Sequence, residues 1–570
     1  MSVPNDSART FLEKNPLLRY LNHHQPHLFR LVWEAYLRAR QARPANQSLH
    51  PLTPILQARG WSKEEKHPPP VKGDSRHILF FSFEGWSTHI IFDGLLGAAL
   101  RQRGVRVSHF TCGGVMPICN LQNASSNVPP MPCGRCRAYA DSGLRAFGHI
   151  PTMIHHLLSA RERAEIAAEV AAIPVDDLLA YTHDGLAYGH FASFSARWFF
   201  GVNQLRTEMR EHVRNYIVLG RTVKAALERL IAKDRPHKII MMNGLLVAER
   251  VVRALAEREG ISYITSERGY LANTFMLSHN YPMGQFEFEP VWEMHRDIPL
   301  REDQRDHLLT YLQERRYGRG QMDNLWKTVQ EGTETLRTAV GLSAERPVVG
   351  VFTNVTGDTA LLDRDQAYSD MTAWIDDLIR RFSALPAVDL VFRIHPAESR
   401  LDRYRPYESV GNYIARHHPI LPSNIKIIPS ESTLSSYTLL EVSDLVMVYA
   451  SNIGLESVLM GKQTVVSGQV HYRGKGFTRD VHTSEDMAGW IERWQSGNLP
   501  PIDQETAQRY AYSFFYRAMI PLDEVMEEGT FGHMRLKIQG VTDLRPGGSR
   551  TFDALCDSIL DGTPFVNPFA

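Results

Sequence analysis

The chain has 570 residues, of which 43% are hydrophobic and 22% charged, a composition typical of soluble globular proteins. Its 63 basic and 63 acidic side chains balance, which excludes the bulk binding of nucleic acid that a polycation shows. The length predicts two or more domains, and no run of about 18 apolar residues predicts a membrane span. The N-terminus lacks the pattern of a signal peptide, so we expect a cytoplasmic protein.

The first part of the chain changes character near residue 70. Apolar side chains recur at helical spacing over residues 1–50, and the stretch 63–76 is rich in proline and charge, as in a linker. We therefore expect a helical N-terminal extension over 1–70. After it, "HILFFSF" (77–83) reads as a strand, "IIFDGLLGAALRQRG" as a helix and "VRVSHF" as a second strand. This order opens a parallel α/β sheet.

The α/β alternation continues and then starts again. Residues 152–235 read as a helical insertion, followed by strands at 238–242 and 262–265. From residue 346 onward, short apolar runs alternate regularly with helical segments, as in a sheet buried on both faces.

We predict two Rossmann-like domains, 71–335 and 336–500, facing a cleft, and a C-terminal helical segment over 501–570. In such folds, ligands bind beyond the carboxyl ends of the strands.

The stretch "VDLVFRIHPAES" (388–399) ends a predicted central strand with polar side chains. Pro396 stops the strand, so the imidazole of His395 is expected to project into the cleft. A histidine there can donate to a phosphate oxygen or protonate a leaving phosphate, and Arg393 can bind the same anion or pair with a carboxylate that holds the loop. Glu398 is placed to meet ribose hydroxyls. The alternative is a strand-terminal histidine whose partners are backbone groups.

A second strand end, "DLVMVYASNIGLESVLMG", leads from a polar turn into a helix. Ser451 or Asn452 is a plausible N-cap, and the free N–H groups of the first turn suit an anion. Glu456 is close enough to accept a hydrogen bond from a sugar hydroxyl, although a plain helix cap with a solvated glutamate has the same pattern. Ser435 and Ser436 offer a similar helix start.

Together, "RIHP", "SDLVMVYASNIGLESVLMGKQTVV" and "GQVHYRGKGFTRD" resemble the glycosyltransferases of capsule polysaccharide biosynthesis, which include Kdo transferases. The resemblance covers roughly residues 340–485 well and 77–300 weakly. It implies the GT-B architecture, in which the second of two Rossmann-like domains holds the nucleotide. It also implies that His395 contacts the donor phosphate, Ser451 and Asn452 form a phosphate turn, and Glu456 holds the sugar or ribose.

The same resemblance bears on substrates and partners. The Arg-x-His-Pro element is similar to that of bacterial sialyltransferases and polyol-phosphate polymerases, so a CMP-sugar donor is favoured. The expected acceptor is a growing surface polysaccharide or glycolipid, with peripheral membrane association through an assembly complex. Lys475 stands where the Kdo enzymes carry tryptophan, and the sugar is left open. A GT-B-shaped nucleotide-sugar epimerase and a non-catalytic binding subunit are the alternatives.

The first α/β half is expected to hold the acceptor, whose proton a carboxylate or imidazole must take. Glu267, in "YITSERGYLANTF", is the first candidate, Glu84 the second and His89 the third. A glutamate that follows a strand often caps a helix or pairs with an arginine such as Arg268, so a structural role is the alternative for both Glu267 and Glu84. Further strand-end residues on the acceptor side are Trp86, Asn243 and Gly269.

Four of the five cysteines fall between residues 112 and 136. Their spacing is C-x6-C-x13-C-x2-C, and the last pair has the separation of a zinc knuckle. We predict a structural zinc held by Cys112, Cys119, Cys133 and Cys136. An iron–sulfur cluster has the same ligands, and four reduced, unbound thiols are the remaining alternative.

Overall fold

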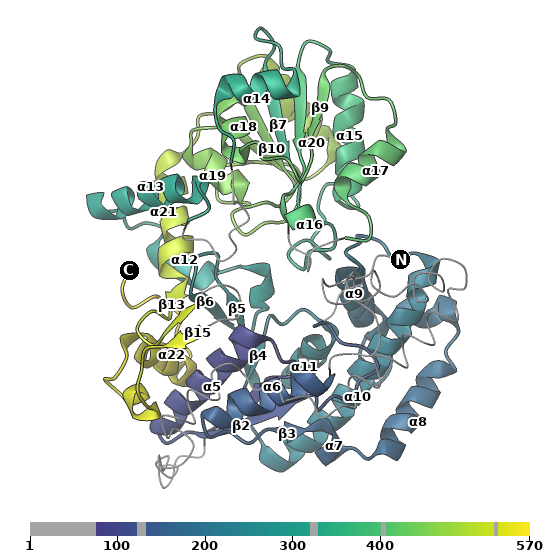
Figure 1. The fold of residues 1–570 in the computed structure, drawn as a ribbon, viewed down its shortest axis with the longest axis vertical. Coiled ribbons are helices and arrows are strands. Elements are labelled where there is room, and N and C mark those ends of the chain that lie inside the picture. Colours follow the sequence, from purple (N-terminus) through teal and green to yellow (C-terminus); the bar gives the residue numbers. More distant parts are fainter. Residues whose placement is uncertain (1–75, 122–132, 320–328, 401–405, 529–533) are drawn as a thin grey trace, which may run out of the picture.

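The computed structural model describes residues 76–121, 133–319, 329–400, 406–528 and 534–570. The predicted extension over 1–70 lies outside these ranges. Two α/β units dominate the molecule, with the second, drawn in green, above the first, drawn in purple to teal (Figure 1). The prediction of a mixed α/β protein built on two largely parallel sheets is confirmed.

The first unit contains a seven-stranded sheet in the order β13-β6-β5-β4-β1-β2-β3. Strands β1 to β5 are parallel to one another, whereas β6 pairs antiparallel with β5 and with the edge strand β13. The strands of this sheet that precede the second unit are β1 (His77–Phe81), β2 (Arg106–Thr111), β3 (Thr152–Met153), β4 (Lys238–Met242), β5 (Ser262–Arg268) and β6 (Thr274–His279). The helices of the same stretch are α5 (Ser87–Gln102), α6 (Cys133–Ala146), α7 (Ile154–Leu157), α8 (Ala160–Ala171), α9 (Tyr188–Phe200), α10 (Arg210–Asp234) and α11 (Val247–Arg258).

The sheet of the first unit is buried on both faces because successive side chains of a strand point to opposite sides. In β1, Ile78 and Phe80 enter the core formed with α5 and the C-terminal helix, whereas Leu79 and Phe81 enter the core formed with α9, α10 and α11. All four side chains are at most 2% exposed. The continuous apolar run that indicated this strand therefore results from two cores that meet at one sheet.

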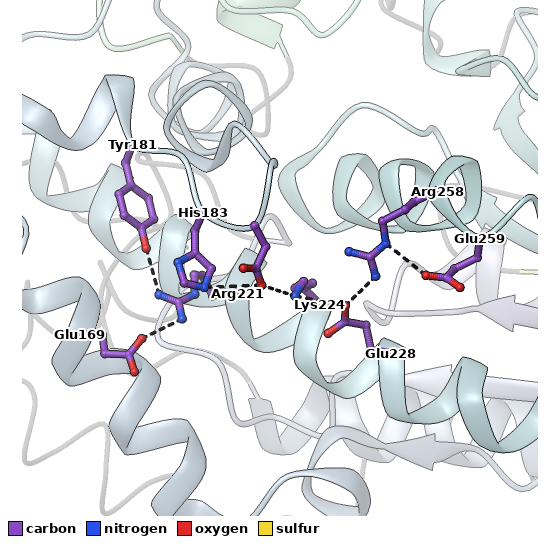
Figure 2. A network of polar contacts seen from close by, with 9 residues as sticks. Glu169, Tyr181, His183, Arg221, Lys224, Glu228, Arg258 and Glu259 are labelled. Carbon is purple, nitrogen blue, oxygen red and sulfur yellow. Dashed lines mark hydrogen bonds and ion pairs between the residues drawn. The ribbon is translucent and has the colours of Figure 1, made fainter.

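The region predicted as a helical insertion, 152–235, is helical except for the short edge strand β3. A chain of polar contacts connects its helices across their outer surface (Figure 2). Arg221 of α10 donates to Glu169 of α8 at 2.7 Å and to the hydroxyl of Tyr181 at 2.9 Å, and Arg258 of α11 donates to Glu228 of α10 at 2.7 Å. Exposed pairs of this kind contribute about 0–1 kcal/mol each, so the helices depend mainly on their buried apolar faces.

The second unit contains a six-stranded, all-parallel sheet in the order β12-β11-β10-β7-β8-β9. Its strands are β7 (Val348–Phe352), β8 (Asp389–Arg393), β9 (Ile425–Ile428), β10 (Leu445–Val448), β11 (Thr464–Val466) and β12 (Arg479–Asp480). Its helices are α15 (Met371–Ser383), α16 (Ala397–Arg400), α17 (Val410–His417), α18 (Ser436–Val442), α19 (Ile453–Leu459) and α20 (Ser484–Gln495). Along the chain, α12 (Glu289–His295), α13 (Glu302–Arg316) and α14 (Thr333–Val340) connect the two units, and α14 packs on α18 and β9 of the second unit.

Ion pairs connect the two units beside the loop that follows β7. Asp363 pairs with Arg197 of α9 and with Arg250 of α11, the latter at 3.1 Å. Burial raises the pKa of Asp363, but the two guanidinium groups outweigh it and hold the pKa below its usual value. The next residue, Arg364, donates to Glu287 at 2.6 Å. Two successive residues of the second unit are thus fixed to the first.

The C-terminal segment, predicted as helical, returns to the first unit and also contributes strands. Helix α21 (Gln504–Tyr512) packs against α13 and α19, and β13 (Ile520–Pro521) then pairs with β6. A hairpin of β14 (Met526–Glu528) and β15 (Met534–Leu536) precedes α22 (Arg550–Asp561), which packs on α5. Figure 1 shows this segment in yellow beside the first unit. Across the ranges that the structure describes, no helix is long and apolar enough to cross a membrane.

The packing of α22 on α5 gives a first prediction. Leu555 of α22 is fully buried in the core beside α5. Leu555→Ala is expected to destabilise the first unit by about 2–5 kcal/mol, because it removes buried methyl groups and leaves a cavity. Thermal unfolding of the full chain measures the effect. Ile420→Ala is the control, since that side chain is 91% exposed and should leave the melting temperature unchanged. Equal melting temperatures for both variants would contradict the packing.

Candidate active site

Glu267 lies near the carboxyl end of β5 with hydrogen-bond donors around its carboxylate. Asn243 Nδ2 donates to Oε2 at 2.8 Å, and the backbone N–H of Arg268 donates to Oε1 at 2.9 Å. His89 Nε2, from the first turns of α5, lies 3.6 Å from Oε1. Three of the predicted acceptor-side residues therefore meet at one place, although they come from three segments far apart in sequence.

The backbone after β4 explains how Asn243 reaches Glu267. Asn243 has φ +56° and Gly244 has φ +85°, so the chain turns sharply through the left-handed region, where asparagine and glycine are favoured. The side-chain oxygen of Asn243 accepts from the N–H of Leu245 at 3.1 Å, which leaves its amide N–H groups for Glu267. The turn after β5 requires glycine at position 269, because the Cβ of any other residue there would lie 2.1 Å from Thr274 Oγ1.

The electrostatic environment keeps Glu267 ionised. Burial raises its pKa, but the nearby imidazole of His89 and the hydrogen bonds from Asn243 and the N–H of Arg268 outweigh burial and lower the pKa below the usual value. The group is therefore a carboxylate at neutral pH, only partly exposed at the end of its strand. A carboxylate in this position can accept a proton from a hydroxyl group that approaches it.

His395 follows β8, as predicted, in a defined protonation state. The N–H of Ala397 donates to His395 Nδ1 at 3.2 Å, so in the neutral ring the proton is on Nε2. Burial, aided by the charge of Arg393, lowers the pKa of His395 to about 4. At neutral pH the ring is thus a neutral donor through Nε2, which suits a hydrogen bond to a phosphate oxygen better than proton donation by an imidazolium.

Within the part of the chain that the structure describes, Arg393 holds a loop by donating to backbone carbonyls and a serine, not to the carboxylate that was expected. Its side chain is 2% exposed, and it donates to Pro429 O at 2.6 Å, to Ser432 O at 3.4 Å and to Ser436 Oγ at 3.2 Å. Ser435 caps α18 by accepting from the N–H of Tyr437 and Thr438. These three predicted donor-binding residues are therefore engaged within the protein. Their direct contact with a nucleotide stays a prediction.

Hydrogen bonds connect the carboxyl ends of β7, β8 and β10. The N–H of His395 donates to Thr353 Oγ1 at 3.2 Å, and the N–H of Ala450 donates to Asn354 Oδ1 at 3.1 Å. Thr353 and Asn354 were not among the predicted site residues. They come directly after the apolar run of β7, and the rule that ligands bind at strand ends could have identified them.

Asp358, in the same loop after β7, lies where the two units meet. Burial raises its pKa, and the negative charge of Glu267 raises it further. The same loop contacts the strand ends of the first sheet, because Leu362 packs in one core with Leu245 and Leu246, which follow β4. Sequence reasoning missed Asp358, since nothing in "NVTGDTA" distinguishes an aspartate at a domain boundary from one in a surface turn.

Ser451 and Asn452 follow β10 at the start of α19. Asn452 is the N-cap residue by position, but its side chain makes no capping bond. Its Oδ1 instead lies 2.7 Å from Nε2 of His471, a buried ring that stacks on Phe514 with centroids 3.9 Å apart. The carbonyl of Ser451 accepts from the hydroxyl of Tyr472 at 2.6 Å. The motif "HYRGKG" therefore holds the turn through His471 and Tyr472. Lys475 of the same motif pairs with Glu289.

Glu456 has a different environment from the one predicted. Its side chain is 2% exposed and is engaged by Arg315 of α13 and by the hydroxyl of Tyr437. The pair connects α19 to the helix between the two units. A buried carboxylate with a charged partner is expensive to expose, so this arrangement favours a structural role. The predicted contact with a sugar hydroxyl is not tested by the structure.

Glu398 lies in α16 and is 5% exposed. Both of its oxygens accept from the N–H of Val410, at 3.2 and 3.3 Å, so the group caps the start of α17. Burial raises its pKa to about 8. A neutral, buried carboxyl group is a weak partner for ribose hydroxyls, and that predicted contact stays untested.

Glu84 is turned away from Glu267. Its carboxylate accepts from Trp86 Nε1 at 2.9 Å and from the N–H of Asn120 at 3.1 Å, and Cys119 Sγ lies 3.5 Å away. Trp86 packs edge-on against Trp198. The second candidate base and the predicted acceptor-side tryptophan therefore belong to the cysteine region. Of the predicted acceptor-side groups, Glu267, His89 and Asn243 are the ones that the structure brings together.

The four clustered cysteines line one cavity together with Glu84. They are free thiols, as is Cys556. Within the described ranges, no group of three or more histidine, cysteine, aspartate or glutamate side chains is arranged to hold a metal ion. The structure therefore brings the predicted ligands to one place without forming a finished metal site.

Comparison with known proteins identifies one region of the chain. Residues 309–494 match the family model described as capsule polysaccharide biosynthesis protein, which confirms the resemblance over these residues. No curated protein sequence matches the chain.

Two solved structures show the range of similar folds. The first is KpsC of Thermosulfurimonas dismutans, a beta Kdo 2,4 transferase, with 15% identity over 54% of this chain and 87% of that one and a TM-score of 0.34. The second is UDP-GlcNAc 2-epimerase from Neisseria meningitidis, with 9% identity over 76% and 96% of the two chains and a TM-score of 0.26. Scores this low carry no functional argument.

The raised pKa of Glu398 gives a second prediction. Between its ordinary value of 4.5 and about 8, folded Glu398 keeps a proton that the unfolded chain has lost, so its contribution to stability falls as the pH rises through this window. Glu398→Gln keeps an acceptor for Val410 without titrating. Relative to wild type, the variant should gain on the order of 4 kcal/mol at about pH 8 and about 1 kcal/mol at about pH 5. Melting temperatures at both pH values measure this.

The exposed Glu431 provides the matched control. Glu431→Gln should show no gain that depends on pH. If Glu398→Gln behaves in the same way as this control, then Glu398 is ionised in the folded protein and is free to serve the donor.

Proposed function

Because residues 309–494 form a capsule polysaccharide biosynthesis domain, we propose that the protein is a glycosyltransferase that moves a sugar from a nucleotide-activated donor to a polysaccharide or glycolipid acceptor. The observation that carries the proposal is the contact of the loop after β7 with the strand ends of the first sheet, where Leu362 packs against Leu245 and Leu246 and Asp363 pairs with Arg250. The ionised carboxylate of Glu267, which accepts from Asn243, belongs to the same strand ends. A transferase of two α/β units needs this arrangement, since one unit holds the donor and the other the acceptor.

The roles follow from protonation states. Glu267 is ionised, so it takes the proton of the acceptor hydroxyl as the hydroxyl oxygen forms a bond to the anomeric carbon of the donor sugar. The bond from that carbon to the phosphate oxygen breaks, and the electron pair stays on the nucleotide. His395 is neutral with its proton on Nε2, and it donates to the phosphate as negative charge develops there. Asn243 and His89 hold the carboxylate of Glu267 in place.

The donor is proposed to be a CMP-sugar. The Arg-x-His-Pro element supports a cytidine nucleotide, because the families that it resembles use CMP- or CDP-linked donors. The sugar, and the proposed peripheral association with a membrane-bound assembly complex, rest on the same resemblance.

A third prediction concerns the two residues given chemical roles. His395→Ala and Glu267→Gln should each lower the rate of sugar transfer ~10²–10⁴-fold, because one loses the donor to the phosphate and the other the proton acceptor. The assay incubates the full chain with CMP-, UDP- and GDP-sugars and an acceptor glycan, and detects the released nucleotide. Release that does not depend on an acceptor, with a rearranged free sugar, would favour the epimerase alternative.

Matched controls separate chemistry from folding. His417 is exposed at the end of α17, and His417→Ala should transfer at the wild-type rate. Glu84→Gln tests the other candidate base, and we expect it to retain activity within a factor of about two wherever its melting temperature is unchanged. A folded Glu267→Gln variant with near wild-type activity would refute the proposed base.

A fourth prediction concerns the nucleotide. A ligand that binds only the folded state raises its melting temperature by mass action. CMP or CDP should therefore raise the melting temperature of the full chain more than UDP or GDP does, and His395→Ala should reduce the shift. A shift with UDP or GDP and none with either cytidine nucleotide would overturn the donor assignment. No shift with any of the four would favour the binding-subunit alternative.

A further inference from the structure

The cysteine cavity lies outside the proposed active site and has features that the transfer reaction does not explain. Two of its thiols, Cys112 and Cys119, belong to the loop that follows β2, and two, Cys133 and Cys136, belong to the first turn of α6. Residues three apart on a helix lie on the same face, so the second pair presents both sulfurs to the cavity. The four sulfurs thus approach from two opposing segments.

Backbone N–H groups point at the sulfurs. The N–H groups of Gly114 and Val115 donate to the sulfur of Cys112, two and three residues before them in the chain. The N–H of Leu121 donates to Cys119 Sγ at 3.4 Å, and the N–H of Gly85 donates to Cys136. A thiol sulfur is a weak acceptor, whereas a thiolate is a strong one. Burial raises the pKa of all four thiols, so they are neutral in the absence of a cation, but N–H donors already lie at three of the sulfurs and would stabilise thiolates once a cation binds.

The glycines of the region make these contacts possible. Gly113 and Gly114 have φ of +71° and +75°, so the loop after Cys112 curls through the left-handed region and turns its N–H groups back toward the sulfur. A Cβ on Gly85 would lie 3.0 Å from Cys136 Sγ. The backbone at Gly85 therefore approaches the sulfur of Cys136 more closely than a larger residue would allow.

Negative charge on these sulfurs requires a cation. Cys119 Sγ lies 3.5 Å from the carboxylate of the buried residue Glu84, and a thiolate there would be repelled by it. In the part of the chain that the structure describes, the cavity-lining residues include one basic side chain, the exposed Arg137. A bound metal ion supplies the missing charge, and four soft thiolates are ligands that zinc prefers.

We propose that Cys112, Cys119, Cys133 and Cys136 bind one zinc ion as thiolates, and that the ion draws the loop after β2 and the first turn of α6 together across the cavity. Four sulfur ligands at about 2.3 Å complete a tetrahedral, structural site and leave no position for a substrate. Glu84, Asn120 and the N–H groups described above surround the ligands and hold them in place.

The zinc site also positions the active site. Glu84, Gly85 and Trp86 form the connection from β1 to α5, and Gly85 is held by Cys136. The first turns of α5 carry His89, which lies beside Glu267. Zinc binding therefore fixes the start of the helix on which a neighbour of the proposed base lies. Cys112, Cys119, Cys133 and Cys136 act as positioning residues and touch no substrate.

The test uses the full chain purified without chelator. Elemental analysis should find about one zinc per chain, and Cys112→Ser and Cys136→Ser should each lose most of it. Cys556→Ala is the matched control, because Cys556 is buried in α22 within a different core and should not affect the zinc content. Zinc-free wild-type protein would overturn the proposal, and so would zinc retained at full content in both serine variants.

A second readout does not depend on how well the variants fold. Wild-type protein stripped of metal and loaded with Co²⁺ alone should show intense thiolate-to-cobalt charge-transfer absorption, which oxygen and nitrogen ligands do not give. The loaded protein should also melt at a higher temperature than the stripped protein. Absence of the thiolate band would overturn the ligand assignment. Iron with acid-labile sulfide in the purified protein would overturn zinc in favour of a cluster.

Discussion

The relative placement of the two units depends on Asp363. It stands at φ +62° in the loop after β7, and its carboxylate accepts from two arginines on different helices of the first unit. The carboxylate is 26% exposed, and the two guanidinium groups hold its pKa below the usual value, so these ion pairs favour the docked arrangement of the units. Five residues earlier, the same loop carries Asp358, whose pKa is raised by burial and by the charge of Glu267. One short segment therefore both joins the units and lines the place where they meet.

Side chains of the same type differ in protonation state because their buried surroundings differ. Glu267 is surrounded by donors and remains ionised, whereas Glu398 has one backbone donor and holds its proton up to a pKa of about 8. His395 is kept neutral by burial and by Arg393. Because Arg393 is itself bound to backbone carbonyls, it acts on the imidazole through its field rather than as a ligand. The residues around each group thus determine whether it can accept or donate a proton at neutral pH.

Sequence patterns predicted the two sheets and the strand ends, because apolar runs and the residues after them are local features. They also singled out Glu267, His89 and Asn243, whose side chains the structure brings together. They could not distinguish a strand-end glutamate that faces a ligand from one that is buried, as Glu84 and Glu456 show, because the difference depends on partners such as Asn120 and Arg315. Asp358 was missed for the same reason, since its importance appears only when the second unit is placed against the first.

The return of the chain to the first sheet has a consequence for how the protein reaches its native state. Strand β6 forms its outer hydrogen bonds with Ile520 and Pro521, and α22 covers one face of α5. During synthesis, the first unit therefore exposes an unpaired sheet edge and an apolar helix face while the whole second unit is being made. Such surfaces promote aggregation. The second sheet, whose strands all lie within 348–480, has no such delay, so the unit encoded later can finish folding earlier.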